Sequence, residues 1–180
     1  EKYHLNPDKI ALWGSSAGGG LASLAGTSAG IRDLQDLSLG YADQSERVQA
    51  VVDWCGTINF STFDQQFEES GVDGELQNNP NSFLSKLMGQ DISEIPEKVQ
   101  KANPEAYITP DDPPFYIQHG TLDDLVPVQQ SREFADKLRA VIGENKVTFV
   151  EMPGEGHCSP GFTNAASISK VLDFLDRNLK

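Results

Sequence analysis

The chain has 180 residues, a formal net charge of −13 and a sequence pI near 4.5. A length of this order allows one domain, residues 1–180, with its own hydrophobic core. The acidic excess disfavours nucleic acid as a partner, because phosphate backbones are bound through clustered Lys and Arg. The apolar runs are too short for a membrane span, so we expect a globular domain without one.

The N-terminal part of the chain predicts a strand, a tight turn and a helix. Residues 9–13 form a short apolar run, and small and apolar residues continue with helical spacing to about Ala29. The junction at residues 14–18, Gly-Ser-Ser-Ala-Gly, fits the pattern G-x-S-x-G in the strand-to-helix context that this pattern requires. It predicts Ser16 as a nucleophile held on the turn, where Gly14 and Gly18 allow strand and helix to approach closely.

A helix that begins after Ser16 directs unpaired backbone N–H groups at a reacting carbonyl group. We therefore expect the backbone N–H of Ala17 to donate a hydrogen bond to an oxyanion. Phosphate-binding loops are the alternative for such a glycine-rich turn. A P-loop requires Lys where Gly20 stands, and a dinucleotide-binding pattern requires Gly where Ser23 stands. We expect neither a cofactor nor a metal.

Further apolar segments predict three more strands, and amphipathic segments predict two helices that cover the sheet. The strands are expected at residues 48–54, 115–118 and 146–151, and the helices at residues 131–142 and 165–179. Strands that alternate with helices indicate an α/β fold, a parallel sheet with flanking helices. Catalytic loops of such sheets lie at the carboxyl ends of the strands.

The stretch at about residues 57–113 interrupts this alternation. It is rich in Asn, Gln, Ser and Glu, and only residues 82–88 within it predict a helix. A connection of this length predicts a lid-like insertion, with a small helical unit that merely covers the sheet as the alternative. We expect Phe60, Phe63 and Phe67 on its apolar underside.

A base that activates Ser16 has to be one of three histidines, His4, His119 and His157. His157 lies in a glycine-rich loop after the last predicted strand, where its ring can reach the nucleophile. The order nucleophile, acid, histidine also favours it, so His157 is the expected base. His4 fits a solvated surface residue, and His119 fits a residue that holds a turn.

The carboxylate that orients the histidine is expected after the third strand, where Asp123 and Asp124 are neighbours. An acid there accepts a hydrogen bond from the imidazole, fixes its tautomer and stabilises the imidazolium form. The spacing alone does not separate the two aspartates. Capping of the next helix is the alternative role for either of them.

Four stretches resemble the esterase/lipase branch of the α/β-hydrolase superfamily, with its acetyl-xylan-esterase-like, feruloyl-esterase-like and hormone-sensitive-lipase-like carboxylesterases. They are residues 6–19, 51–54, 111–127 and 154–157. In the pattern H-G-x-x-D-x-x-V-P of this group the catalytic acid is the first aspartate, which corresponds to Asp123. The resemblance implies a serine carboxylesterase for small neutral esters, including acetyl or feruloyl esters of carbohydrates. A prolyl-oligopeptidase-like serine peptidase and a catalytically silent binding module are the alternatives.

The sequence departs from this family upstream of the nucleophile. The family usually has earlier strands and an H-G-G-type loop that supplies a second oxyanion donor, and this sequence shows neither. A parallel sheet without those strands would expose an edge. We therefore expect self-association, an additional N-terminal segment or a rearranged N-terminus to complete the sheet.

The substrate pocket and the cysteines carry the remaining expectations. We expect Ser15, Trp54, Phe60 and Val126 to contact the substrate, with core packing as the alternative for Trp54 and Phe60. Some similar esterases pair a cysteine that follows the histidine with one that precedes the nucleophile. Here Cys158 follows His157, but Ser15 occupies the other position. Cys55 is the other available partner, and two buried free thiols are the expected state.

Overall fold

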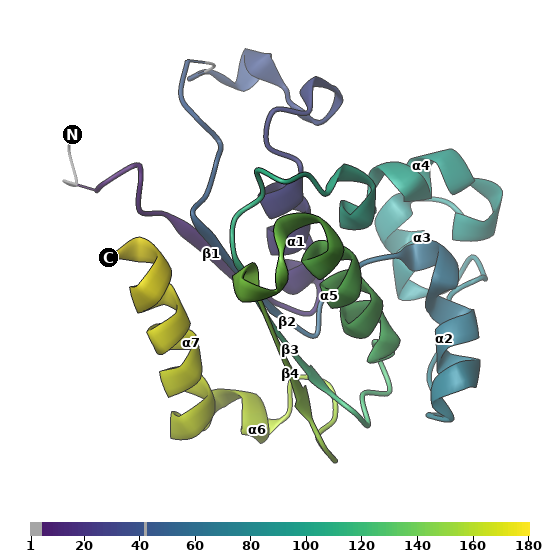
Figure 1. Cartoon of the computed structure of the whole chain (residues 1–180). Coiled ribbons are helices and arrows are strands. Elements are labelled where there is room, and N and C mark those ends of the chain that lie inside the picture. Colours follow the sequence, from purple (N-terminus) through teal and green to yellow (C-terminus); the bar gives the residue numbers. More distant parts are fainter. Residues whose placement is uncertain (1–4, 42) are drawn as a thin grey trace.

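The computed structural model describes residues 5–41 and 43–180, so the prediction for His4 lies outside the described residues. Its centre is a sheet of four parallel strands in the order β1-β2-β3-β4 (Figure 1). The strands are β1 (Ala11–Ser15), β2 (Ala50–Trp54), β3 (Phe115–Gly120) and β4 (Val147–Met152). The predicted α/β fold with a parallel sheet is confirmed, and the carboxyl ends of all four strands lie along one edge.

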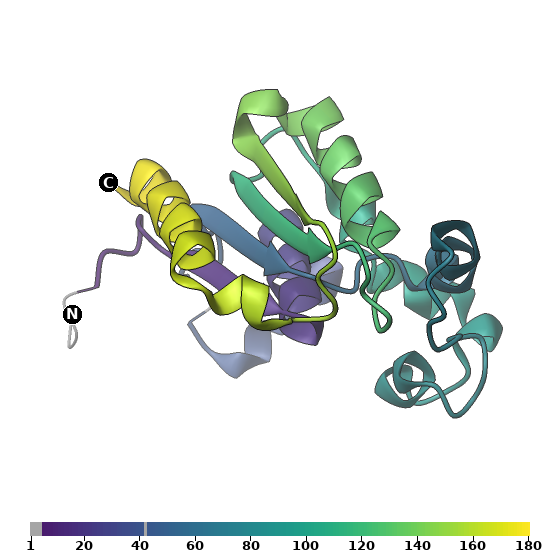
Figure 2. The same cartoon turned by 90° about the horizontal axis from the view of Figure 1, so that it is seen from below.

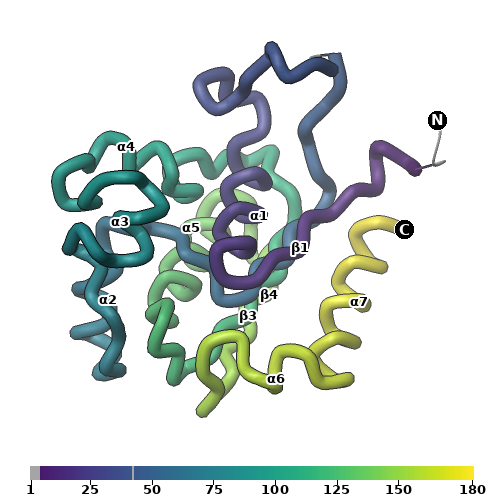
Figure 3. The backbone as a smooth tube through the Cα atoms, turned by 180° about the vertical axis from the view of Figure 1, so that it is seen from behind, coloured from purple at the N-terminus to yellow at the C-terminus, as the bar shows by residue number. Residues whose placement is uncertain are grey.

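Helices cover both faces of this sheet. α1 (Ala17–Thr27) and α5 (Gln129–Ile142) pack on one face, and α7 (Ala165–Leu179) packs on the other, after the short helix α6 (Pro160–Thr163) (Figures 1 and 3). The two long helices predicted from amphipathic patterns are confirmed as α5 and α7. At the start of α7 the side chain of Asn164 accepts a hydrogen bond from the N–H of Ser167, which caps the helix.

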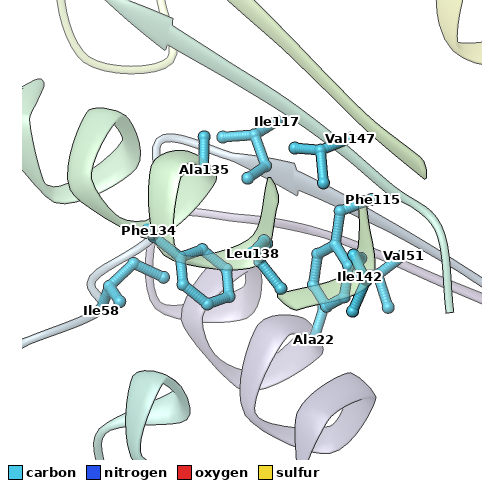
Figure 4. Packing of buried hydrophobic residues seen from close by; sticks show 10 residues of the cluster. All are labelled: Ala22, Val51, Ile58, Phe115, Ile117, Phe134, Ala135, Leu138, Ile142 and Val147. Atoms are coloured by element: carbon cyan, nitrogen blue, oxygen red, sulfur yellow. The ribbon is translucent and has the colours of Figure 1, made fainter. Parts of the chain in front are cut away.

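The sheet can be covered on both faces because successive strand residues point to opposite sides. The cluster on the side of α1 and α5 contains Ala22, Val51, Ile58, Phe115, Ile117, Phe134, Ala135, Leu138, Ile142 and Val147 (Figure 4). The cluster on the side of α7 contains Ala50, Val52, Trp54, Cys55, Tyr116, Phe162, Val171 and Phe174. Every residue of β2 and β3 is buried, so these two strands form the rigid centre of the sheet.

The connection between β2 and β3 contains three helices, and the prediction of a single helical piece there is wrong. They are α2 (Phe63–Ser70), α3 (Phe83–Met88) and α4 (Pro96–Lys101). Each is too short for a clear apolar period, and local signals mark their ends. Left-handed glycines follow α2 and α3, Pro96 begins α4, and a side chain caps the start of α3. The Oγ of Ser82 accepts a hydrogen bond from the N–H of Ser85 at 3.1 Å. Figure 2 shows this connection on the side of the molecule away from α7.

The connection has an apolar cluster of its own. It contains Phe60, Phe63, Phe67, Leu84, Met88, Ile92, Val99 and Val126, so the three predicted phenylalanines are buried there. 3₁₀ turns occur at Arg32–Leu34, Leu37–Leu39, Phe60–Thr62, Ile92–Glu94, Pro104–Tyr107 and Glu144–Lys146. Among the described residues, none of the helices combines the length and the apolar character needed to cross a bilayer.

Candidate active site

Ser16 lies on the turn between β1 and α1, with φ 56° and ψ −127°. Residues other than glycine rarely adopt a positive φ, so this turn is strained. The N–H of Ser16 donates to the carbonyl oxygen of Trp54 at 2.8 Å, which ties the turn to the end of β2. A serine on such a turn presents its hydroxyl above the edge of the sheet.

The two glycines that flank this turn differ in what they do. A Cβ on Gly14 would lie 2.0 Å from the carbonyl oxygen of Gly18, so only glycine fits at position 14. A Cβ on Gly18 would meet nothing within 4 Å. The expectation that both glycines are needed for close approach is therefore wrong for Gly18. Its backbone carbonyl contacts Gly14, but a side chain at position 18 would have room.

The structure brings Ser16, His157 and Asp123 together from the ends of three strands. The Nε2 of His157 lies 2.8 Å from the Oγ of Ser16, and its Nδ1 lies 2.8 Å from the Oδ2 of Asp123. An ionised carboxylate only accepts hydrogen bonds, so Nδ1 donates and Nε2 is free to accept the serine proton. This arrangement allows the imidazole to activate the hydroxyl.

Asp123 is buried and accepts four hydrogen bonds or close polar contacts. Its Oδ1 accepts the N–H groups of Leu125 and Val126, at 3.0 and 2.8 Å. Its Oδ2 is shared by the Nδ1 of His157, at 2.8 Å, and the Nε2 of His119, at 3.2 Å. Burial alone would raise the pKa of Asp123, but the hydrogen bonds from His119 and His157 outweigh burial and hold it well below its usual range. The N-cap of α5 is Val128, so neither Asp123 nor its neighbour caps that helix.

His119 is the functional neighbour that the sequence does not reveal. It lies within β3 with a fully buried side chain, rather than in the turn that its neighbour Gly120 suggested. Its Nε2 is 2.9 Å from the carbonyl oxygen of Val126, which can only accept, so Nε2 carries the proton. Its Nδ1 then accepts from the hydroxyl of Ser131 at 2.6 Å. His119 thereby presents a fixed N–H to Asp123.

The pKa of His157 results from opposing causes. Burial by itself lowers it, but hydrogen bonds with Asp123 and with Cys158 outweigh burial and raise it above its ordinary value. The protonated ring is therefore favoured beside these two groups. That is the form the imidazole takes after it has accepted a proton from Ser16.

A small apolar cavity with a volume of about 130 Å³ lies against Ala17, the residue after Ser16. It lies between the start of α1 and the connection, and its lining residues are Ala17, Gly20, Leu21, Leu24, Thr57, Phe60, Leu87, Met88 and Ala102. Ala17, the exposed first residue of α1, has a backbone N–H at a helix start, where such groups have no partner within the helix.

The four residues expected to contact substrate differ in their positions. Phe60 lines the cavity together with Ala17. Ser15 is exposed at the end of β1, and Val126 is buried in the cluster of the connection. Trp54 is buried on the α7 side of the sheet, where its ring packs at 5.7 Å from that of Phe162. Core packing accounts for the position of Trp54, and its contact with substrate stays a prediction.

The cysteines lie against the same site. Their Sγ atoms are 2.9 Å apart, with Cys55 buried and Cys158 exposed, so the expectation of two buried thiols is wrong for Cys158. Ligand atoms of Cys55, Cys158 and His157 lie within 4.8 Å of one another and could hold a metal ion. Both ring nitrogens of His157 already have partners, so a metal there would displace Ser16 or Asp123.

Asp53 is a second buried carboxyl group that the sequence does not mark as functional. Burial raises its pKa to about 6, although a hydrogen bond from the Ser23 hydroxyl, at 2.8 Å, opposes this. A Cβ on Gly19 would lie 2.3 Å from its Oδ1, so the glycine of α1 makes room for the carboxyl. Asp53 thereby joins β2 to the helix that carries the nucleophile turn.

Comparison with known proteins places this geometry in a family. The BD-FAE family model matches residues 1–138. The probable carboxylic ester hydrolase LipM of Mycobacterium tuberculosis is 33% identical over 161 residues, which are 87% of this chain and 33% of LipM. Esterase LipQ of the same organism is 31% identical over 180 residues, and the chain covers 39% of it. The chain thus spans between a third and two fifths of the length of these relatives.

Solved structures agree with this assignment. The bifunctional GH43-CE protein of Bacteroides eggerthii superimposes with a TM-score of 0.84 at 32% identity, over 99% of this chain and 23% of that chain. The family model covers more than half of the sequence, and the structural neighbour at 32% identity shares the fold over almost the whole chain. The chain therefore belongs to the BD-FAE family of esterase/lipase-type α/β-hydrolase domains.

Proposed function

We propose that the chain hydrolyses carboxylic esters through an acyl-enzyme on Ser16. The observation that carries the proposal is the continuous set of contacts from Ser16 to His157 to Asp123, each 2.8 Å long, built on a strained turn. LipM is described as a probable carboxylic ester hydrolase and LipQ as an esterase, which supports the same reaction for this chain.

In the proposed reaction the Oγ of Ser16 attacks the acyl carbon while the Nε2 of His157 takes the hydroxyl proton. The same proton then passes to the leaving alcohol, which leaves an acyl group on Ser16. A water molecule, deprotonated by His157, attacks that acyl group and releases the acid. Asp123 remains ionised and orients the ring, and the N–H of Ala17 stabilises the oxyanion.

We propose short acyl groups on neutral alcohols as the substrate class. The cavity beside Ala17 holds about 130 Å³ and has mainly apolar side chains in its lining. The net charge of −13 disfavours anionic esters. One structural neighbour, with 28% identity and a TM-score of 0.83, is a truncated form of a carbohydrate esterase from gut microbiota, which supports esters of carbohydrates as candidates.

Replacement of the nucleophile tests the proposed function. Ser16→Ala removes the attacking oxygen, and we expect hydrolysis of p-nitrophenyl acetate to fall by roughly 10³-fold or more. Ser169→Ala is the matched control, because Ser169 is exposed on α7 and has no part in the contacts of the site. Mass spectrometry of acid-quenched protein should find the acetyl group on Ser16. Unchanged hydrolysis by the alanine variant would refute the mechanism.

We also propose that the free edge of β1 pairs with a further strand and that the connection acts as a lid-like insertion. β1 pairs only with β2 within the described sheet, and Ile10 and Trp13 near that edge are 42% and 41% exposed. Apolar side chains beside unpaired strand groups favour addition of a strand. Sedimentation analysis of the chain alone tests whether a second copy provides it: a monomer at all concentrations would exclude self-association.

A further inference from the structure

Two cysteines from distant segments meet beside the histidine of the site. Cys55 directly follows β2, Cys158 directly follows His157, and their Sγ atoms are 2.9 Å apart. The N–H of Cys55 donates to the carbonyl oxygen of Gln118 at 2.8 Å, so the end of β3 holds Cys55 in place. The two thiols therefore join the loop that carries His157 to the rigid part of the sheet.

The backbone at both cysteines has an uncommon conformation. Cys55 has φ 44° and Cys158 has φ 45°, and non-glycine residues adopt such values only where their surroundings enforce them. A disulfide has an S–S distance of about 2.05 Å. Because Cys158 is on an exposed loop, a movement of that loop by about an ångström suffices to bring the sulfurs to bonding distance.

The two thiols differ in reactivity. The hydrogen bond from Cys55 lowers the pKa of Cys158, burial opposes this, and hydrogen bonding with His157 lowers it further, which favours the thiolate form of the exposed sulfur. The same hydrogen bond and burial raise the pKa of Cys55. An exposed thiolate beside a buried thiol matches the pattern of an attacking and a resolving cysteine.

We propose that Cys55 and Cys158 form a redox-active dithiol that a hydroperoxide converts into an intramolecular disulfide. In the first step the thiolate of Cys158 attacks one oxygen of the hydroperoxide, the O–O bond breaks, and a sulfenic acid and a hydroxide or alkoxide ion are formed. In the second step the sulfur of Cys55 attacks the sulfenic sulfur, the S–O bond breaks, and the thiol proton leaves with the hydroxyl as water. The two sulfurs together lose two electrons, which the hydroperoxide gains.

The disulfide would have two effects on the molecule. It would close a covalent loop between residues 103 positions apart, which restricts the unfolded chain and stabilises the fold. It would also remove the negative charge of Cys158 beside His157. If the proposed ester hydrolysis holds, the oxidised protein should be active at lower pH than the reduced protein. In the oxidised protein, the groups that face the imidazole ring of His157 are Asp123, Ser16 and the disulfide.

Peptide mapping tests the disulfide without using ester hydrolysis. The reduced chain is freed of reductant in buffer with a metal chelator, treated with an equimolar amount of hydrogen peroxide, alkylated and digested. We expect a linked peptide pair that contains Cys55 and Cys158, in monomeric protein, which disappears after treatment with dithiothreitol. Full alkylation of both cysteines, disulfides between separate chains, or a stable sulfinic acid on Cys158 without the linked pair would each overturn the proposal.

Single variants test the order of the two steps. In Cys55→Ser the resolving thiol is missing, so we expect dimedone to label the sulfenic acid of Cys158. In Cys158→Ser we expect no labelling, because Cys55 is buried. Labelling of Cys55 instead would overturn the assignment of the attacking thiol.

A stability measurement provides a second readout. We expect oxidation to raise the thermal midpoint of the wild-type chain by roughly 5 to 10 °C, and to leave the midpoint of Cys55→Ser unchanged. A linked pair without any rise in the midpoint would show that the bond strains the loop. That result would overturn the inference that this geometry is suited to a disulfide. Neither measurement depends on catalysis, so an inactive chain would refute only the proposed function.

Discussion

The carboxyl edge of the sheet and the connection at residues 56–114 are held in place by different means. At the edge, Ser16, Asp123 and His157 each follow a strand whose neighbours fix its register. The connection consists of short helices that side-chain caps and a separate apolar cluster hold together. It is fastened to the sheet layer by Gln130 of α5, whose Oε1 accepts the N–H groups of Ile58 and Asn59 at 2.8 and 2.7 Å.

The groups of the proposed reaction are therefore held more rigidly than the residues that line the cavity. Positions at the strand ends cannot shift without disturbing several buried neighbours, whereas the connection supplies Phe60, Met88 and Ala102 to the cavity from short, locally stabilised pieces. We therefore expect substitutions at the edge to affect the rate of reaction with every substrate. Substitutions in the connection should mainly change which acyl group is accepted.

The largest effect is expected at the nucleophile turn. The Cβ of Gly14→Ala would lie 2.0 Å from the carbonyl oxygen of Gly18, so the turn must open. We expect a loss of stability of about 3 kcal/mol and a loss of kcat/KM of roughly 10³-fold, measured by denaturant unfolding and hydrolysis of p-nitrophenyl acetate.

Gly18→Ala is the matched control for this prediction. A Cβ at position 18 meets nothing within 4 Å, and alanine favours a helix over glycine by about 0.5–1 kcal/mol. We expect this variant to be at least as stable as the wild type and to remain active. Equal damage from the two substitutions would show that the turn does not depend on the close approach at Gly14.

A smaller effect is expected from the residue behind the acid. His119→Asn shortens the side chain and removes the N–H that Asp123 faces at 3.2 Å. A hydrogen bond to a charged group contributes about 1.5–3 kcal/mol, so we expect kcat to fall roughly 10- to 100-fold while KM changes little. Ser131→Ala removes only the hydroxyl that holds the ring and should lower kcat less. A change in thermal midpoint without a change in kcat would assign His119 a purely structural role.

The connection should respond differently. Ala102→Leu adds three carbon atoms to a cavity of about 130 Å³. We expect the ratio of butyrate to acetate hydrolysis, as kcat/KM, to fall about tenfold, with acetate hydrolysis almost unchanged. Ala106→Leu makes the same change at an exposed position and should leave the ratio unaltered. An equal loss for both esters in Ala102→Leu would mean that the connection also positions the reacting groups.

The smallest effect is expected on the pH dependence. His157 accepts a proton from Ser16 only when neutral, so kcat/KM should rise as the pH rises through its pKa. Burial lowers this pKa, but Asp123 and Cys158 raise it above its ordinary value. In reduced Cys158→Ser the negative charge is lost, so the half-maximal pH should move to a lower value. The reduced Cys55→Ser variant keeps the thiolate of Cys158 and should move less. An unchanged profile in both would show that the thiolate does not act on His157.

Much of the fold can be predicted because its signals are local. α7 begins and ends where its apolar spacing predicts, and the four strands overlap the predicted apolar runs, although β1 and β3 each extend two residues beyond theirs. α2 and α4 cannot be predicted in this way, because they are too short for a period, lack a side-chain cap and depend on the cluster around Phe63. The face that Trp54 occupies follows from strand alternation, since it shares its parity with Val52, a signal that the sequence already contains.

The site can be predicted where a sequence motif occurs only in one kind of local structure. G-x-S-x-G between strand and helix indicates Ser16, and the chain order then indicates His157. The choice of Asp123 over Asp124 depends on the resemblance. The two residues are neighbours along a loop, and only the three-dimensional structure shows which of them faces His157. The partnership of His119 with Asp123 depends on long-range packing, so no pattern in the sequence reveals it. The sequence offers Cys55 as a partner for Cys158, but only the structure shows that the two meet. The catalytic roles remain predictions until the Ser16→Ala measurement.

The strand order of the sheet repeats the order of the chain, β1-β2-β3-β4. During synthesis the serine turn therefore emerges first, and the histidine loop becomes available only after the last strand has docked. A ribosome-bound chain that ends before β4 carries a hydroxyl with no base beside it, and it cannot attack esters around it. Under the proposed function, the capacity for hydrolysis thus arises late, together with the completed sheet.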